Sequence, residues 1–249
     1  TNAWMRGPSG TDEIDNTSMV FVSPSLNEGV IAESWEFPDP LTMIFHIRKG
    51  VRFHNKPPLN GREVVASDVA FSMRRLFDAP ISTLCSLVPA ANRPIAIETP
   101  DKYTVVLKFA KYNSGVFGNI TSTVFVTAPE AARGESLRDW RNAIGTGAFM
   151  LIDYVRGSCA TLTKNPDYWM KDPFFPENTL PYVDVVKLFV IPDLSTRVAA
   201  LRTGKLDVVW DLPGDQMENL EKTNPWLKKY PRVTSSGGFS LRVDRPPFN

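Results

Sequence analysis

The fold class is set by residues 43–77, which read MIFHIRKGVRFHNKPPLNGREVVASDVAFSMRRLF. At the start of this stretch, Met43, Phe45 and Ile47 alternate with residues of a second face, as in a half-buried strand. The segment Tyr103–Phe109 repeats the same period of two. The sequence therefore predicts two half-buried β-strands, one before and one after a helix.

The end of the same stretch predicts this helix, which is amphipathic and runs over about Asp68–Phe77. Ser67 is a good N-cap, and Asp68 suits the positive end of the helix dipole. The apolar residues of one helical face follow at i, i+4, i+7 and i+8: Val69, Met73, Leu76 and Phe77.

Later segments continue the alternation of strands and helices. We expect strands at Ala148–Val155, Val183–Ile191 and Leu206–Trp210, and the second of these is apolar on nearly both faces, as in a covered sheet. Further helices are expected between Asp193 and Gly204 and between Asp215 and Pro225. Strands interleaved with helices predict α/β layering.

Composition and charge exclude several classes of protein. The chain has 28 Lys and Arg against 27 Asp and Glu, so no strong overall field would attract nucleic acid or an acidic membrane. With 43% hydrophobic and 22% charged residues, the chain is expected to be globular. No stretch is apolar enough to span a bilayer. The chain begins at Thr1 without a leader, so we expect any export signal to have been removed or left out.

Motifs that carry chemistry are scarce. The two histidines, His46 and His54, are eight residues apart, which matches no common zinc pattern. No nucleophile elbow, phosphate loop or dinucleotide-binding motif occurs. Cys85 and Cys159 lack the CxxC spacing, so a disulfide and two free thiols both remain open. The sequence therefore predicts no catalytic residue, no metal site and no cofactor.

Two other classes remain as alternatives. A hydrolase could use a carboxylate pair, Asp207 with Asp211 or Asp12 with Asp15, although solvated carboxylates are far commoner than such pairs. A protein-interaction module would instead show a contiguous exposed apolar patch. Converging carboxyl groups in one pocket would favour the hydrolase.

Seven segments carry a resemblance to a known family. Ile31–Glu36 is similar to the motif LAESWE, Phe45–His54 to FxLRKGVKFHDG, and Leu59–Ser72 to NGRExxAxDVxFS. The others follow in the family's order: Ile144–Phe149, Lys164–Trp169, Ile191–Arg197 and Ala199–Asp207. Together they span about residues 30–210. The chain thus resembles the extracytoplasmic solute-binding proteins of family 5, the peptide- and nickel-type receptors of ABC importers.

The resemblance implies a class II periplasmic-binding-protein-like α/β fold. We expect one incomplete lobe with mixed β-sheets flanked by helices, because family members are roughly twice as long as this chain. A smaller α/β subdomain is expected at residues 38–140, and the main sheet domain at 1–37 plus 141–249. The second lobe is expected to be absent.

The resemblance also implies a function without catalysis. We expect a receptor that binds a solute, most typically a peptide, and hands it to an ABC permease in the membrane. Nickel chelates, sugars and opines are bound by other relatives. The receptor would be a monomer without affinity for nucleic acid, located outside the cytoplasm, in the periplasm or lipid-anchored at the cell surface. Because one lobe offers only half of a binding shell, we expect this chain alone to bind solute weakly or not at all.

The candidate ligand-binding residues lie in two segments, at about 81–87 and 119–126. In peptide-binding relatives these regions of the first lobe contribute to the cleft, although neither segment carries a family motif here. The candidates offer hydroxyl groups and apolar walls: Ser82, Thr83, Leu84, Ser122, Thr123 and Phe125.

Overall fold

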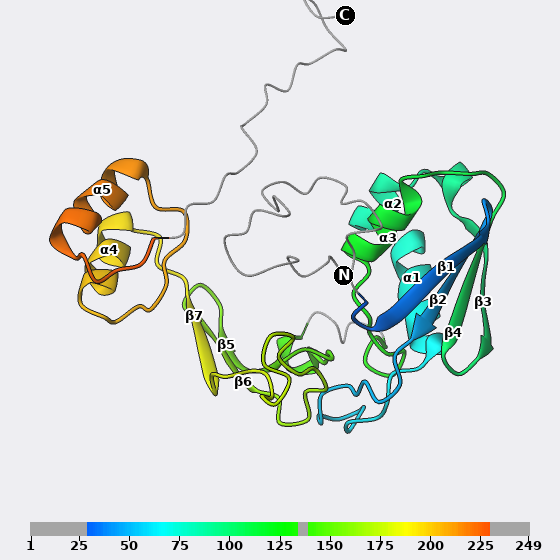
Figure 1. Cartoon of the computed structure of the whole chain (residues 1–249), viewed down its shortest axis with the longest axis horizontal. Helices are drawn as coiled ribbons and strands as arrows, with labels where there is room; N and C mark the ends of the chain where they lie inside the picture. The colour runs from blue at the N-terminus through cyan, green and yellow to red at the C-terminus, as the bar shows by residue number, and fades with distance from the viewer. Residues whose placement is uncertain (1–28, 134–138, 230–249) are drawn as a thin grey trace, which may run out of the picture. The chain divides into compact units, whose positions relative to one another are not determined.

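The structure is a computed structural model that describes residues 29–133 and 139–229. These residues belong to two compact units, the first with residues 29–133 and 139–192 and the second with residues 193–229. Figure 1 shows their helices and strands. Asp12 and Asp15, one of the candidate carboxylate pairs, lie outside the described residues. The subdomain limits expected from the sequence stay a prediction.

The first unit contains an antiparallel four-stranded sheet in the order β1-β2-β4-β3 (Figure 1). Its strands are β1 (Ala32–Asp39), β2 (Thr42–Ile47), β3 (Pro94–Asp101) and β4 (Thr104–Phe109). The two strands predicted from alternation are confirmed as the central pair, β2 and β4, in which Phe45 lies opposite Val105. Both residues are buried, together with Ile47 and Leu107. One face of the central strands therefore forms the core.

Helix α1 (Ala66–Asp78) contacts β3 and β4 and confirms the predicted amphipathic helix. It begins two residues earlier than predicted, with Val65 instead of Ser67 at the N-cap. The cause is Asp68, whose carboxylate accepts a hydrogen bond of 3.0 Å from the Val65 N–H and so caps the helix from its third position. Arg62 holds this carboxylate through hydrogen bonds of 2.8 and 2.9 Å.

Two shorter helices, α2 (Thr83–Leu87) and α3 (Val116–Thr123), complete this part of the first unit. Helix α2 contacts both α1 and α3. Leu84 of α2 and Ile120 of α3 are buried in the same core as the central strands. In Figure 1 the three helices gather beside the four-stranded sheet.

A second antiparallel sheet in the first unit has the order β5-β6-β7. Its strands are β5 (Phe149–Val155), β6 (Cys159–Lys164) and β7 (Val185–Phe189). The strand predicted at Ala148–Val155 is confirmed, and so is the α/β class. The strand predicted at Val183–Ile191 exists as β7. The expectation that this strand lies inside a sheet covered on both faces is wrong. Among the described residues β7 lies at a sheet edge, and Val185, Leu188 and Phe189 are exposed, because an apolar pattern does not say what covers it.

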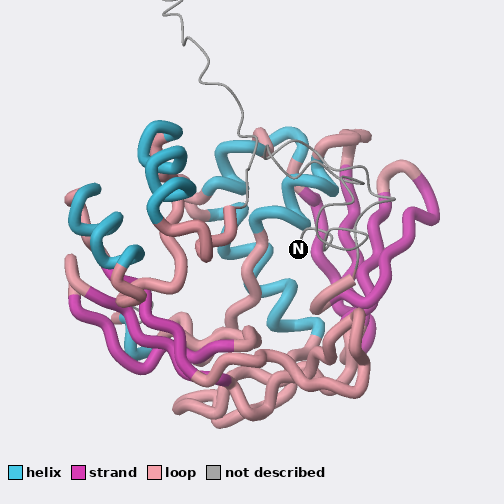
Figure 2. Tube along the Cα trace, turned by 60° about the vertical axis from the view of Figure 1, so that its left-hand side comes forward, coloured by secondary structure: helices cyan, strands magenta, loops and turns pink. Residues whose placement is uncertain are grey.

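His54 joins the loop after β2 to the turn before β5. Figure 2 shows that loops make up a large part of the first unit. The His54 ring is buried, its Nδ1 accepts a hydrogen bond of 3.2 Å from the Gly145 N–H, and its Nε2 lies 3.0 Å from the Gly147 carbonyl oxygen. Since a carbonyl only accepts, the ring is neutral with its proton on Nε2. Burial lowers the pKa of His54 and favours this neutral form.

The second unit contains two helices, both of which the sequence predicted. They are α4 (Leu194–Arg202) and α5 (Gly214–Thr223). Asp193 caps α4 by accepting a hydrogen bond of 2.7 Å from the Thr196 N–H, and Gly204 ends it with a φ of 67°. The strand predicted at Leu206–Trp210 is wrong, because this segment has no pairing strand among the described residues.

Candidate functional site

The first predicted binding segment folds into α2 and the turn before it. The Ser82 hydroxyl caps α2, accepting a hydrogen bond of 3.1 Å from the Cys85 N–H and donating one of 2.5 Å to the Leu76 carbonyl. Leu84 is buried in the core, with 1% of its surface exposed. Of the three candidates, Thr83 is the exposed one.

The second predicted segment folds into the end of α3 and the residues after it. The Ser122 hydroxyl donates a hydrogen bond of 2.7 Å to the Gly118 carbonyl, and the Thr123 hydroxyl donates one of 2.6 Å to the Asn119 carbonyl. A hydroxyl that donates in this way keeps its acceptor lone pairs. Phe125 follows the helix and is 80% exposed. The segment therefore offers hydrogen-bond acceptors beside an exposed aromatic ring.

Helices α2 and α3 contact each other, so the structure brings the two predicted segments into one region (Figure 1). We call five exposed residues of this region the α2–α3 surface: Ile81, Thr83, Leu87, Ser122 and Phe125. Sequence reasoning did not single out Ile81 and Leu87. A signal was present, because Ile81 directly precedes the capping residue of the short helix α2 and Leu87 is the last residue of that helix. Apolar side chains with a few placed polar groups are typical of ligand-binding surfaces.

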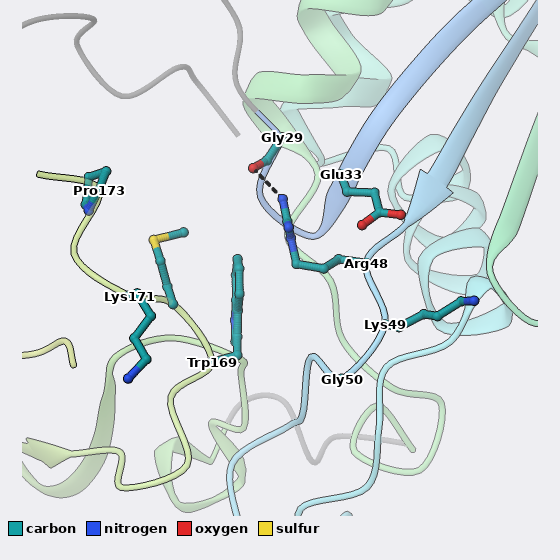
Figure 3. Close-up of a pocket in the computed structure, with 9 residues that line it drawn as sticks. Gly29, Glu33, Arg48, Lys49, Gly50, Trp169, Lys171 and Pro173 are labelled. Carbon is teal, nitrogen blue, oxygen red and sulfur yellow. Dashed lines mark hydrogen bonds between the residues drawn. The ribbon is translucent and has the colours of Figure 1, made fainter. Parts of the chain in front are cut away.

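A pocket of about 700 Å³ lies elsewhere in the first unit (Figure 3). It is lined by residues near the start of β1 and the end of β2, and by Trp169, Met170, Lys171 and Pro173. Arg48 is held at its wall by hydrogen bonds of 2.9 Å to the Val30 carbonyl and 3.2 Å to the Gly29 carbonyl. Its guanidinium carbon lies 5.3 Å from the centre of the Trp169 ring. The pocket therefore presents a cation fixed against an aromatic face.

Basic side chains outnumber acidic ones around this pocket. Arg48, Lys49 and Lys171 line it together with a single carboxylate, that of Glu33. In Figure 3 the ammonium groups of Lys49 and Lys171 point away from Trp169, so they contribute a positive field at the rim. Sequence reasoning assigned neither Arg48 nor Trp169 to a binding site. Their meeting depends on a contact between segments about 120 residues apart, which no local pattern predicts.

The described residues also bear on metal binding, on a carboxylate pair and on a disulfide. They contain no group of three or more His, Cys, Asp or Glu side chains that could hold a metal ion. Asp207 and Asp211 are exposed in the second unit, and Cys85 and Cys159 are free thiols. Within residues 29–133 and 139–229, no helix is long and apolar enough to cross a membrane.

Comparison with known sequences gives a family match. The family described as bacterial extracellular solute-binding proteins, family 5 Middle, matches residues 28–249. The chain is 26% identical over 238 residues to the periplasmic oligopeptide-binding protein OppA of Haemophilus influenzae. That alignment covers 88% of this chain and 42% of OppA.

Comparison with solved structures gives neighbours with two kinds of ligand. The periplasmic binding protein DppA from Helicobacter pylori, in complex with the peptide STSA, is 26% identical with a TM-score of 0.63, over 79% of this chain and 40% of that one. MoaA from A. tumefaciens R10, in complex with mannopinic acid, is 25% identical with a TM-score of 0.66, over 81% and 38%. The chain thus spans about two fifths of the length of these relatives.

Proposed function

Since this chain belongs to the bacterial extracellular solute-binding proteins of family 5, we propose that it is a peptide-binding part of a receptor for an ABC importer. The receptor acts outside the cytoplasm, in the periplasm or anchored by a lipid at the cell surface. It binds its solute without catalysis and releases it unchanged to the membrane permease. The family match over residues 28–249 carries the proposal.

Two observations favour peptides as the solute. OppA is named for oligopeptides, and the DppA neighbour holds the peptide STSA. The α2–α3 surface suits the same chemistry, because the Ser122 hydroxyl keeps lone pairs for a peptide N–H while Ile81 and Phe125 offer contacts to apolar side chains. An opine is the second candidate, since the MoaA neighbour holds mannopinic acid.

We propose that this chain supplies one side of a clamp. Residues 38–140, as the smaller subdomain, carry the α2–α3 surface, and the main sheet domain is the remainder. A segment that covers about two fifths of a relative's length offers only part of the contacts that a closed clamp makes. Peptide binding by this chain alone is therefore weak.

Photo-crosslinking tests the proposal because it captures weak complexes. A tripeptide with a photoreactive benzoyl group is irradiated with the chain, and labelled residues are located by mass spectrometry. We expect labels in residues 81–87 and 119–126 that excess unlabelled tripeptide removes. Phe125→Ala should reduce this labelling, whereas Phe174→Ala, at an exposed phenylalanine outside the surface, should leave it unchanged. Competition by mannopinic acid alone would assign the surface to opines, and the absence of competed labels from both segments would refute the site.

A further inference from the structure

The positively charged guanidinium group of Arg48 has no carboxylate partner among the described residues. Its Nε and Nη2 atoms donate to the Val30 and Gly29 carbonyls. A guanidinium has five N–H donors in one rigid plane, so these bonds fix its position and leave other donors without a partner among the described residues. The group is thus held in place, close to the Trp169 ring, before any ligand arrives.

Two other arginines of the first unit show what sets Arg48 apart. Arg62 is neutralised by the carboxylates of Asp68 and Glu130, each at 2.8 Å. Arg93 donates to the Val88 carbonyl and to the Cys85 carbonyl and sulfur. Arg48 has no carboxylate partner among the described residues, and it lines a pocket of about 700 Å³.

The other residues of the pocket indicate which size and chemical groups an anionic ligand would need to fit. Trp169, Met170 and Pro173 provide an aromatic face and apolar contacts. The indole N–H of Trp169 is buried and has no hydrogen-bond partner among the described residues. The volume lies in the range of small-molecule sites, about 300–1,000 Å³. Lys49 and Lys171 make the rim positive.

From these contacts we infer that the pocket is a second binding site, for the carboxylate of a small ligand whose apolar or aromatic part lies against Trp169. A planar carboxylate matches the guanidinium fork through two parallel hydrogen bonds. A free organic acid and the C-terminus of a short peptide offer this same group. The pocket shares no residue with the α2–α3 surface, so this inference and the proposed function can fail independently.

The test compares acids with neutral analogues of the same shape. The 249-residue chain is titrated calorimetrically with 3-phenylpropionate and with 3-phenylpropionamide. We expect the acid to bind about tenfold more tightly or better, because only the acid makes charge-assisted hydrogen bonds to Arg48. The dipeptide alanyl-phenylalanine and its C-terminal amide form the second arm. If the carboxylate form binds more tightly than its amide in just one of the two arms, that arm shows whether the pocket takes a free organic acid or the C-terminus of a peptide.

Variants at the rim show whether the pocket is responsible. Because Arg48 also holds the backbone at Gly29 and Val30, Arg48→Gln would change structure as well as charge. Pro173 is exposed and makes no such bond, so Pro173→Glu adds a negative charge to the lining and Pro173→Gln is its matched control. Lys187→Gln removes a positive charge outside the pocket.

We expect Pro173→Glu to weaken acid binding by about fivefold or more at low salt, as placing a like charge beside a bound anion should. Lys187→Gln should bind as the unmodified chain does. Pro173→Gln, which loses the same apolar contact as Pro173→Glu without adding a charge, should bind the acid more tightly than Pro173→Glu does. The inference is overturned if acid and amide bind equally in both arms, if neither binds saturably, or if Lys187→Gln weakens binding as much as Pro173→Glu does.

Discussion

His54 ties the loop after β2 to the turn before β5 only while its ring is neutral. A proton on Nδ1 would face the Gly145 N–H and break that hydrogen bond. Burial lowers the pKa of His54 below its ordinary value of 6.5, so the unfolded chain binds a proton at a higher pH than the folded chain does. The stability that depends on the neutral ring is therefore complete above pH 6.5 and is lost as the pH falls below this value.

We expect the free energy of unfolding to fall between about pH 7 and pH 5 in the unmodified chain, and to fall less steeply in His54→Gln. Urea denaturation at each pH measures it. His46→Gln is the control, because His46 is partly exposed and pairs with Glu36 at the surface, and it should keep the steep slope. Equal slopes for the unmodified chain and His54→Gln would contradict this role.

Glu63 makes the opposite kind of contribution. Hydrogen bonds from Lys102 and from the Gly50 N–H lower the pKa of Glu63 from 4.5 to about 2. Its stabilising effect is therefore present above pH 4.5 and is lost as the pH falls towards about 2. We expect Glu63→Gln to be less stable than the unmodified chain at pH 6, with a difference that shrinks across this window in acid denaturation curves. A constant difference would show that the carboxylate charge is not involved.

At the scale of elements, the start of α1 decides between two capping arrangements. Asp68 is 2% exposed, accepts from the Val65 N–H, and neutralises Arg62. Arg62 is 32% exposed and keeps Glu130 as a partner, so the main loss in Asp68→Ala is the helix cap, and the free energy of unfolding should fall by about 1–2 kcal/mol. Ser67→Ala should change it by less than about 0.5 kcal/mol, since Ser67 does not cap the helix. Urea denaturation measures both, and a large loss in Ser67→Ala would restore Ser67 as the cap.

Elements with a local cause were predictable. The alternation in β2 and β4 and the cap and stop residues of α4 act within a few residues, and each predicted element forms. The cover of β7 and the pairing of Leu206–Trp210 depend on distant chain, so the same reasoning failed there. The predicted start of α1 was two residues too late, because Asp68 serves both as a cap and as a partner of Arg62.

The candidate sites show the same difference between features with a local cause and features that depend on distant parts of the chain. The sequence predicted two candidate binding segments, at about 81–87 and 119–126, and the structure brings α2 and α3, which lie in these segments, into contact. It could not show that Leu84 is buried, because burial depends on the packing of α2 against its neighbours. It also could not show the pocket, which needs Arg48 and Trp169 to meet from distant segments.

For the whole molecule, the central claim is that this chain binds a peptide loosely on the α2–α3 surface and leaves it intact. Titration of an unlabelled tripeptide into the isotope-labelled chain, followed by NMR, tests this most directly. The account predicts saturable shifts in α2 and α3 with a dissociation constant of about 1 mM or weaker, equivalent to about −4 kcal/mol, and a peptide spectrum that does not change with time. Signals of cleaved peptide, or saturation with no shift in either helix, would contradict it.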